Sequence, residues 1–318
     1  SRKTPKRVVF TEADNYKILK AAQISIEDGT AIPILLGQRN KINQLIEENG
    51  LVFENIQIID PADEPETRKR YGEEFYKMRQ RKGMSHYDCT KVMIHRNYYG
   101  TMMVHCGDAD AVISGLTKNY PSTIVPALQA MGTNHISKVV AGMYIMLTKY
   151  GPMFFADTTV NINPTWEDLV SIALLTHDKV KKLRVEPVIA MLSYSNFGSA
   201  KGEEVIKIKK AVEHLHQNYP DIIIDGDIQA NFAINSTRRN EMFPFSKWGK
   251  KQINTFIFPN LAAGNISYKL MQELGGFEAI GPVLMGLNKS VHILQLGSSV
   301  REIVNMVNIA VVDAQSNG

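Results

Sequence analysis

The sequence predicts an α/β protein of two domains, with mainly parallel sheets and helices on both faces. Short apolar runs alternate with longer amphipathic stretches along the chain, which is typical of buried parallel strands that alternate with helices. The runs are residues 8–10, 32–36, 56–59, 111–113, 139–147, 153–155, 188–192, 222–224 and 256–258. With 318 residues, the chain is long enough for two hydrophobic cores.

The helical periodicity is clearest in three sets of apolar residues: Val205, Ile208, Val212 and Leu215; Ile266, Leu270 and Leu274; and Ile303, Val307, Ala310 and Val311. Recurrence every three or four residues predicts an amphipathic helix for each set. Gly275 and Gly276 would end the second helix as a C-cap. Two-domain α/β proteins often return their last helix to the first domain, but the pattern alone does not decide whether the third helix does so.

Polar or small residues follow four of the predicted strands: Ser114-Gly115, Asp157, Ser193 and Asp225-Gly226-Asp227. In open α/β sheets, ligands bind outside the carboxyl ends of the strands. The sequence therefore predicts a cleft lined by backbone amides and hydroxyl groups.

The composition argues against several classes of partner. A formal charge of +4, from 36 basic and 32 acidic residues without a block of like charges, does not favour nucleic acid. The two cysteines, Cys89 and Cys106, form no CxxC pair and fit a reduced, cytoplasmic protein. No apolar run reaches the roughly 18 residues of a bilayer-spanning helix, so we expect no membrane partner.

The motifs argue against several chemistries. Neither G-x-G-x-x-G nor G-x-x-x-x-G-K-[ST] occurs, which disfavours nicotinamide chemistry and ATP hydrolysis within this chain. His214 and His216 lie two apart on a helical pattern and are expected at the surface. Asp108 and Asp110 have oxygen ligands for a metal, but carboxylates just before a buried strand are more often solvated turn residues. We predict no metal.

The segment 193–202, Ser-Tyr-Ser-Asn-Phe-Gly-Ser-Ala-Lys-Gly, lies where a predicted strand meets a predicted helix. Backbone N–H groups at a helix start, with Ser199 and Lys201 beside them, suit a phosphate or pyrophosphate. A glycine- and serine-rich turn with an N-cap explains the same residues equally well. The residues alone leave both interpretations open.

Taken in order along nearly the whole chain, several segments resemble the phosphate acetyltransferase (phosphotransacetylase) family. They are residues 6–10, 107–115, 155–157, 191–195, 198–200, 260–265 and 281–289. The resemblance implies two α/β domains with an isocitrate/isopropylmalate dehydrogenase-like topology: residues 1–137 with 287–318, and residues 138–286. It also implies a homodimer and a cleft between the domains that holds coenzyme A and acetyl phosphate.

The chain departs from the catalytic pattern of this family. Where active members carry a serine, an arginine and an aspartate, this sequence has Gln295, Leu296 and Glu302, and Val125 stands at the position of a second arginine. Arginine grips a phosphate dianion with two parallel hydrogen bonds, whereas leucine and valine have no donor. Glu302 also completes the capping box Ser299-Val300-Arg301-Glu302, which we favour over a role as a base.

A family member without its catalytic set resembles the C-terminal region of the large, hybrid-type malic enzymes, and residues 96–100, 117–121 and 242–248 are similar to that branch. The resemblance implies that oxidative decarboxylation of malate, with NAD(P) and a divalent metal, belongs to N-terminal domains absent here. Ser1 in place of Met fits a fragment. The region itself would bind no cofactor, sense acetyl-CoA or CoA as an effector and help assemble the oligomer.

The residues expected to hold that effector fall into two groups. Gly198, Ser199 and Lys201 would bind the pyrophosphate, and the hydroxyl groups of Thr117, Ser122, Thr123, Ser193 and Ser195 would border the pantetheine arm. Two alternatives remain open: an active phosphate acetyltransferase with an altered site, and a purely structural oligomerisation domain.

Overall fold

The computed structural model describes residues 4–133 and 139–316. The chain divides into two compact units, unit 1 (Ser1–Thr133 with Leu287–Gly318) and unit 2 (Asn134–Gly286). The sequence-based boundary at 137/138 lies outside the described residues, and the second boundary coincides with the expected one. Each unit is an α/β structure, which confirms the predicted fold class.

Among the described residues, unit 1 holds a five-stranded sheet in the order β11-β4-β1-β2-β3, and all of its pairings are parallel. Its strands are β1 (Lys6–Phe10), β2 (Ala31–Leu36), β3 (Gln57–Ile59), β4 (Ala111–Ser114) and β11 (Ser290–Ile293). Its helices are α1 (Tyr16–Glu27), α2 (Arg39–Glu48), α3 (Pro65–Arg79), α4 (His86–Val92), α5 (Arg96–Cys106), α6 (Tyr120–Met131) and α12 (Val300–Ser316), with short 3₁₀ turns η1 (Pro61–Asp63) and η2 (Gln80–Lys82).

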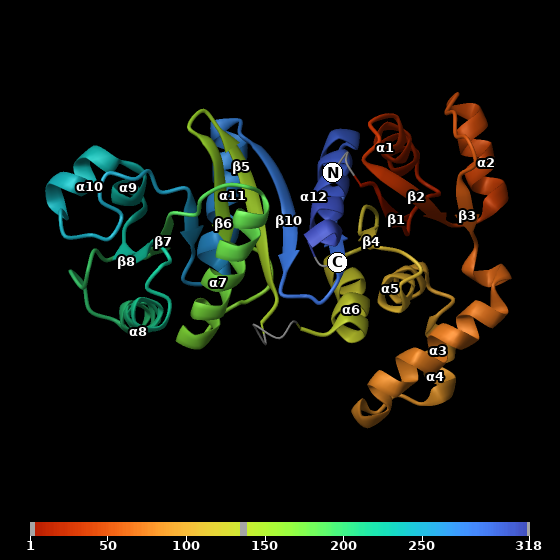
Figure 1. Cartoon of the computed structure of the whole chain (residues 1–318), viewed down its shortest axis with the longest axis horizontal. Coiled ribbons are helices and arrows are strands. Elements are labelled where there is room, and N and C mark those ends of the chain that lie inside the picture. The colour runs from red at the N-terminus through yellow and green to blue at the C-terminus, as the bar shows by residue number, and fades with distance from the viewer. Residues whose placement is uncertain (1–3, 134–138, 317–318) are drawn as a thin grey trace. The chain divides into compact units, whose positions relative to one another are not determined.

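Helices cover both faces of this sheet because its central strand is apolar on both. In β1, Val8 and Phe10 enter the core formed with α1 and α12, whereas Val9 enters the core formed with α3, α4, α5 and α6. The last helix, α12, packs against α1, β1, β4 and β11. Figure 1 shows it in blue beside the first elements of the chain in red. Unit 1 is therefore closed by both ends of the sequence.

Unit 2 contains a six-stranded sheet, among the described residues, in the order β10-β5-β6-β9-β7-β8. Its strands are β5 (Ala141–Thr148), β6 (Gly151–Ala156), β7 (Ile189–Leu192), β8 (Ile224–Ile228), β9 (Thr255–Ile257) and β10 (Glu278–Met285). Its helices are α7 (Trp166–Lys182), α8 (Glu203–Asn218), α9 (Ala230–Ile234), α10 (Ser236–Met242) and α11 (Leu261–Gly275).

The expectation that all apolar runs form parallel strands is wrong for β5. This strand pairs antiparallel with both β6 and β10, whereas β6, β9, β7 and β8 pair parallel. Only two residues separate β5 from β6, and a turn that short can join only antiparallel neighbours. The mainly parallel character of the fold remains.

The helix predictions are confirmed, with one informative difference. α8 buries Val205, Ile208, Val212 and Leu215 as expected. α11 ends at the C-cap Gly276 with a positive φ of 62°, also as expected. However, the residues whose spacing predicted α11 point away from the core, and the helix buries Gly264 and Tyr268 instead.

Within residues 4–133 and 139–316, no helix combines the length and the apolar composition that a bilayer-spanning segment requires.

Candidate functional site

In unit 1, the loop after β4 wraps around a buried carboxylate. Glu12, which follows β1, accepts hydrogen bonds from the backbone amides of Gly115 and Leu116 at 2.7 Å and of Thr117 at 2.9 Å. The Thr117 hydroxyl also donates to Glu12. Consecutive amides of this kind form an anion-binding concavity. Here the chain fills it with its own side chain, so the Thr117 hydroxyl already has a partner.

The loop after β11 lies against the same loop. The amide of Leu294 donates to the carbonyl of Ser114 at 2.7 Å, and that of Gly297 donates to the carbonyl of Leu116 at 3.2 Å. A Cβ at Gly115, whose φ is +100°, would lie 2.8 Å from Ile293, so this approach requires glycine. The structure thus brings the segment containing Gln295 and Leu296 next to the segment containing Thr117.

Leu296 and Val125 present apolar surface to solvent. The Leu296 side chain is 66% exposed, and Val125, on α6, is 39% exposed. Neither can donate a hydrogen bond to an anion. The hydroxyl groups of Ser122 and Thr123, one turn earlier on α6, donate to the carbonyl of Asn119 at the helix start. Each hydroxyl oxygen can still accept a hydrogen bond from a ligand, but its proton is already donated to Asn119.

A chain of buried hydrogen bonds holds these loops of unit 1 together. The Thr11 hydroxyl donates to Ser114 at 2.7 Å, the Ser114 hydroxyl donates to the Asn97 side chain at 2.9 Å, and the Asn97 amide reaches the carbonyl of Ser122 at 3.4 Å. All but Ser122 are buried. Thr11, Glu12 and Asn97 were not among the predicted site residues, although Thr11 and Glu12 directly follow a predicted strand.

Glu302 forms the expected capping box. Its carboxylate accepts the Ser299 amide at 2.7 Å, and its own amide donates to the Ser299 hydroxyl at 3.2 Å. Both interactions belong to the first turn of α12. The structural interpretation of this pair is confirmed.

In unit 2, five consecutive backbone amides of the loop between β7 and α8, those of residues 196–200, are already paired. Asn196 donates to the Ser199 hydroxyl, Phe197 to the carbonyl of Asp227, Gly198 to the Asp227 carboxylate, Ser199 to the carbonyl of Asn196, and Ala200 to the Ser195 hydroxyl. These five amides are therefore not available to a phosphate in this conformation. The amides at the start of α8 remain, because its N-cap Gly202 provides no side-chain cap. The hydroxyl groups of Ser195 and Ser199 lie 3.5 Å apart and share one hydrogen bond, so one of the two keeps its proton for a ligand, and the Lys201 side chain is exposed.

Two carboxylates anchor neighbouring loops, Asp225 and Asp227, and they lie within β8 and not after it as the sequence predicted. The buried Asp227 accepts the Gly198 amide at 3.1 Å, and Asp225 accepts the Lys247 amide at 2.8 Å. Phe197 packs against Phe243, Phe245 and Trp248, which joins the two loops through aromatic contacts. The predicted Asp225-Gly226-Asp227 cluster thus shapes the loops of the site.

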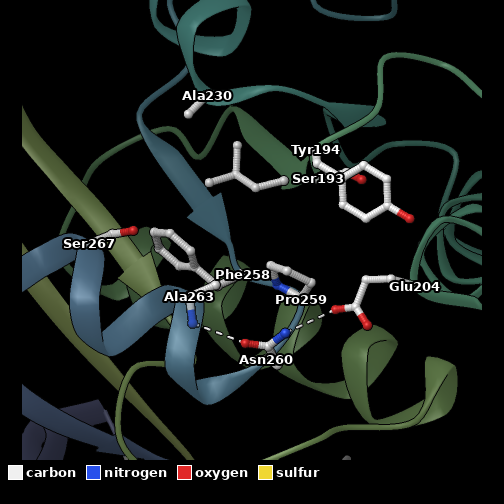
Figure 2. A pocket seen from close by; sticks show the side chains of 10 residues that line it. Ser193, Tyr194, Glu204, Ala230, Phe258, Pro259, Asn260, Ala263 and Ser267 are labelled. Carbon is white, nitrogen blue, oxygen red and sulfur yellow. Dashed lines mark hydrogen bonds between the residues drawn. The ribbon is translucent and has the colours of Figure 1, made fainter. Parts of the chain in front are cut away.

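A cavity of about 540 Å³ opens beside this loop, within unit 2. Its lining consists of Leu192, Ser193, Tyr194, Glu204, Ala230, Phe258, Pro259, Asn260, Ala263 and Ser267 (Figure 2). Of the predicted ligand-binding residues, Ser193 alone belongs to this lining. Lys201 lies near its rim, because the hydroxyl of Tyr194 approaches the carbonyl of Lys201 at 3.5 Å. A Cβ at Gly202 would overlap that hydroxyl.

Glu204 is the one formally charged residue in that lining, all of which is in the described part of the chain. Its carboxylate forms an ion pair with Lys207 at 3.2 Å and accepts a hydrogen bond from Asn260 at 3.2 Å (Figure 2). The pair neutralises the wall of the cavity. An apolar cavity with a few hydroxyl and amide groups suits a neutral, extended ligand portion better than a phosphate.

Three residues of this lining were not predicted from the sequence as ligand-binding: Glu204, Asn260 and Ser267. Ser193 directly follows β7, whereas Phe258 and Pro259 separate Asn260 from β9, so the strand-end signal was weaker for Asn260. Glu204 and Ser267 lie on helices, where their periodicity does not distinguish a cavity wall from a solvated surface.

The two carboxylates before β4, Asp108 and Asp110, already bind other side chains of the protein. Asp108 accepts from Arg70 and Tyr71, each at 2.6 Å, and Asp110 forms a two-point ion pair with Arg7. Burial alone raises the pKa of Asp110, but the hydrogen bonds and charge of Arg7 outweigh it and hold this pKa below its ordinary value. Among the described residues, no group of three or more His, Cys, Asp or Glu is placed to hold a metal ion.

The two histidines expected at the surface are half-buried. His216 lies 2.9 Å from the carbonyl of Ile224, and His214 packs against Trp166. The prediction of surface histidines is wrong, because α8 turns this part of its surface toward β8 and α7.

Comparison with known proteins gives a consistent family. A family model described as Phosphate acetyl/butaryl transferase matches residues 1–311. The phosphate acetyltransferase of Clostridium acetobutylicum is 37% identical over 322 residues, which cover 99% of this chain and 96% of that protein. The chain belongs to the phosphate acetyl/butaryl transferase family.

The chain is also similar to a solved transferase and to part of a longer enzyme. A solved phosphotransacetylase from Streptococcus pyogenes matches with a TM-score of 0.91 and 34% identity, covering 98% of this chain and 94% of that structure. The NADP-dependent malic enzyme of Salmonella typhimurium is 35% identical over 321 residues, which cover 99% of this chain but only 42% of that enzyme. The family thus includes full-length transferases as well as regions of longer proteins.

Proposed function

We propose that this chain is the phosphotransacetylase-like regulatory and oligomerisation region of an NAD(P)-dependent malic enzyme, that it binds acetyl-CoA or CoA as an effector, and that it has lost transacetylase chemistry. The observation that carries the proposal is the exposed Leu296 on the loop beside the Glu12-filled amide concavity. Where the resemblance expects an arginine for the transferring phosphate, the chain offers a side chain without a donor.

Transfer of an acetyl group between coenzyme A and phosphate requires positive charge or donors on the phosphate oxygens. Removing one such donor typically costs about 10²–10³ in rate. Leu296 and Val125 lack donors, and the carboxylate of Glu302 already accepts a hydrogen bond from the Ser299 amide. Two positions of the expected catalytic set therefore lack a donor, and the carboxylate of the third already accepts a hydrogen bond. This supports the loss of transacetylase activity.

Binding of the thioester depends on other groups. The cavity of unit 2 has apolar walls from Leu192 and Phe258 together with hydrogen-bonding groups such as Ser193, which match the amides and methylenes of a pantetheine arm. Its neutralised wall disfavours a phosphate inside the cavity. The exposed Lys201, near the rim, offers an ammonium to the pyrophosphate, with Ser199 beside it.

In the parent protein, NAD(P), the divalent metal and the malate chemistry would belong to domains outside this chain. The Salmonella malic enzyme supports this arrangement, since the chain matches 42% of its length. Malic enzyme activity is thus proposed of the whole protein and not of these residues.

A second candidate function is an active phosphate acetyltransferase, favoured by the match to 96% of the Clostridium enzyme at 37% identity. Acetyl phosphate and coenzyme A, mixed with this chain, distinguish the two. The proposal expects negligible formation of acetyl-CoA by thioester absorbance. Turnover comparable to that of an ordinary phosphotransacetylase would favour the second candidate.

The binding part of the proposal is tested by calorimetric titration of acetyl-CoA, with an expected Kd of about 1–100 μM. Lys201→Ala should weaken binding about tenfold by removing a charge-assisted contact. The matched control is Lys210→Ala, an exposed lysine of α8 that lies outside the cavity lining. No heat and no thermal stabilisation at millimolar acetyl-CoA would leave only the structural role.

A further inference from the structure

Residues 243–251, in the segment between α10 and β9, hold an aromatic ring in solvent. Phe245 is 67% exposed, and Met242, just before this segment, is 58% exposed. An edge-on contact with Phe197, at 4.9 Å between ring centroids, supports the Phe245 ring from the protein side. Large apolar side chains that stay exposed together mark interaction surfaces. We call residues 243–251 the aromatic loop.

Buried polar contacts fix the aromatic loop to the rest of unit 2. The Trp248 indole donates to the carbonyl of Ile189 at 2.7 Å. Arg239, which is fully buried, lies over the Trp248 ring and donates to the carbonyls of Gly249 at 3.4 Å and Lys251 at 2.6 Å. Within residues 4–133 and 139–316, no carboxylate forms an ion pair with Arg239, so backbone carbonyls stabilise its charge. A backbone fixed in this way presents Phe245 in one position, which lowers the entropic cost of binding.

The aromatic loop also contacts the loop expected to bind the effector. Phe197, against which Phe245 packs, precedes Ser199 by two positions and Lys201 by four. Its φ of 48° lies in the left-handed region, which bulky residues rarely adopt, and its ring contacts hold it there. The exposed ring of Phe245 therefore lies beside the loop that carries the expected pyrophosphate donors.

Exposed lysines make the aromatic loop positive. Residues 242–251 contain Lys247, Lys250 and Lys251, all exposed, and no Asp or Glu. The Lys247 amide donates to the buried Asp225 at 2.8 Å, which fixes the backbone that carries this side chain. In the described part of the chain, no carboxylate pairs with the Lys247 ammonium. An aromatic ring beside such a lysine suits a phosphorylated nucleoside, whose base stacks and whose phosphate needs a cation.

We propose that the aromatic loop binds the 3′-phosphoadenosine end of acetyl-CoA, with adenine stacked on Phe245 and the 3′-phosphate paired with Lys247. This inference rests on the proposed function. The cavity of Figure 2 would hold the pantetheine arm, and Lys201 at its rim the pyrophosphate. The three subsites then follow the order of the groups along the ligand: a neutral arm, a pyrophosphate and a phosphorylated nucleoside.

The chemistry of this subsite determines what it can recognise. Every nucleobase has a flat face, so stacking on one aromatic ring discriminates weakly between bases. A charge-assisted contact to a phosphate discriminates between ligands that have this group and ligands that lack it. The subsite should therefore recognise the 3′-phosphate more strictly than the base.

Stacking is tested by calorimetric titration of acetyl-CoA into the full chain. Phe245→Ala should raise the Kd about tenfold, and Phe245→Trp should restore wild-type affinity, because both rings stack on a base. The matched control is Tyr150→Ala, an equally exposed aromatic residue between β5 and β6, which should leave the Kd unchanged. An unchanged Kd for Phe245→Ala would overturn the stacking.

Phosphate recognition is tested with 3′-dephospho-acetyl-CoA. The wild-type chain should bind acetyl-CoA about fivefold more tightly than the dephosphorylated ligand. Lys247→Ala should bind both ligands alike, whereas the control Lys210→Ala on α8 should keep the preference. A preference that persists in Lys247→Ala would overturn the role of this lysine.

A nucleotide without a pantetheine arm separates this inference from the proposed function. Adenosine 3′,5′-bisphosphate should bind the wild-type chain with a Kd of about 0.1–1 mM, measured by protein NMR, and Phe245→Ala should weaken it at least about fivefold. Absence of nucleotide binding, or binding that Phe245→Ala leaves unchanged, would overturn the subsite. Absence of acetyl-CoA binding would overturn the proposed function, and the nucleotide titration would still decide the subsite.

Discussion

At the scale of single residues, this chain is distinguished by polar groups that already have partners. The Thr117 hydroxyl donates to Glu12, the Gly198 amide donates to Asp227, and the Glu302 carboxylate accepts from the Ser299 amide. What remains for a ligand is the exposed Lys201 and the hydroxyl groups of the loop between β7 and α8. Motif similarity alone cannot reveal this, because it does not show which donors the protein consumes internally.

Glu12→Gln should destabilise unit 1. One carboxylate oxygen accepts from Gly115 and Leu116 and the other from Thr117, so the N–H₂ group of glutamine would face the donors on one of these two sides and leave them unpaired, at a cost of about 2–3 kcal/mol. Urea denaturation measures the change. Glu47→Gln, at an exposed position of α2, is the control and should be neutral. Equal stability of the two variants would contradict the role assigned to Glu12.

The Arg7–Asp110 pair should contribute to acid sensitivity. Because the pKa of Asp110 is depressed in the folded protein, the pair stabilises the fold fully above the unfolded pKa of about 3.9, and this stabilisation is lost as the pH falls through the lower folded pKa. Asp110→Asn should therefore lower Tm at pH about 7, with a difference from wild type that shrinks at pH about 2.5. Scanning calorimetry at both pH values measures it. A gap that persists in acid would refute the assignment, and Asp221→Asn, at an exposed aspartate, serves as control.

At the scale of elements, the sequence predicted those segments whose apolar periodicity is uninterrupted. β10 and β11 were missed for different reasons. In β10, Gly281 and Pro282 break the apolar run at a register shift. In β11, the polar residues Ser290 and His292 are buried because they bond to Ala310 and Asp313 of α12, a partnership that exists only after folding.

The same reasoning explains how much of the candidate site was predictable. Ser193 was found because a polar residue after a buried strand lies at the carboxyl edge of the sheet. Glu204 was not found, because its role depends on Asn260, which long-range folding brings beside it, as well as on Lys207 one turn later on the same helix. The periodicity of Ile266, Leu270 and Leu274 predicted a helix correctly. However, periodicity alone does not tell whether the apolar face of a helix is buried or exposed in the folded chain.

The first turn of α12 gives a prediction for Glu302. Glu302→Ala should cost about 0.5–2 kcal/mol by removing half of the capping box, whereas Glu302→Gln should be nearly neutral because glutamine completes the same box. Thermal unfolding followed by circular dichroism measures both. A Glu302→Gln variant as unstable as Glu302→Ala would show that the negative charge, and not the cap, is what the position requires.

At the scale of the whole molecule, unit 1 is discontinuous in sequence. Its sheet pairs β4 with β11, although about half of the chain lies between these two strands, and α12 covers β1 and α1 from the other end of the sequence. Ile303, Met306 and Val307 of α12 belong to the same core as Val8 and Phe10. Unit 2 is built from one continuous stretch and has a core of its own.

Removing residues 299–318 should therefore affect the units unequally. The core shared with α12 would be opened to water, and hydrogen exchange in β1 and β4 should accelerate to nearly unprotected rates. β7 and β9 of unit 2 should keep their protection. Mass spectrometry of exchanged peptides measures both, with a deletion of Gln315 onward as control. Loss of protection throughout the chain would show that the two units unfold together.

The discontinuity of unit 1 also determines the order in which the two units can fold during synthesis on the ribosome. Chains emerge from the amino end, so the first strand of unit 1 leaves the exit tunnel long before the helix that covers it. The continuous unit can complete its core first, while the apolar surfaces of β1 and α1 stay uncovered until α12 is synthesised. During that interval the nascent chain carries a half-covered sheet, which is a binding site for chaperones and a point where a pause in translation or a premature stop would lead to aggregation.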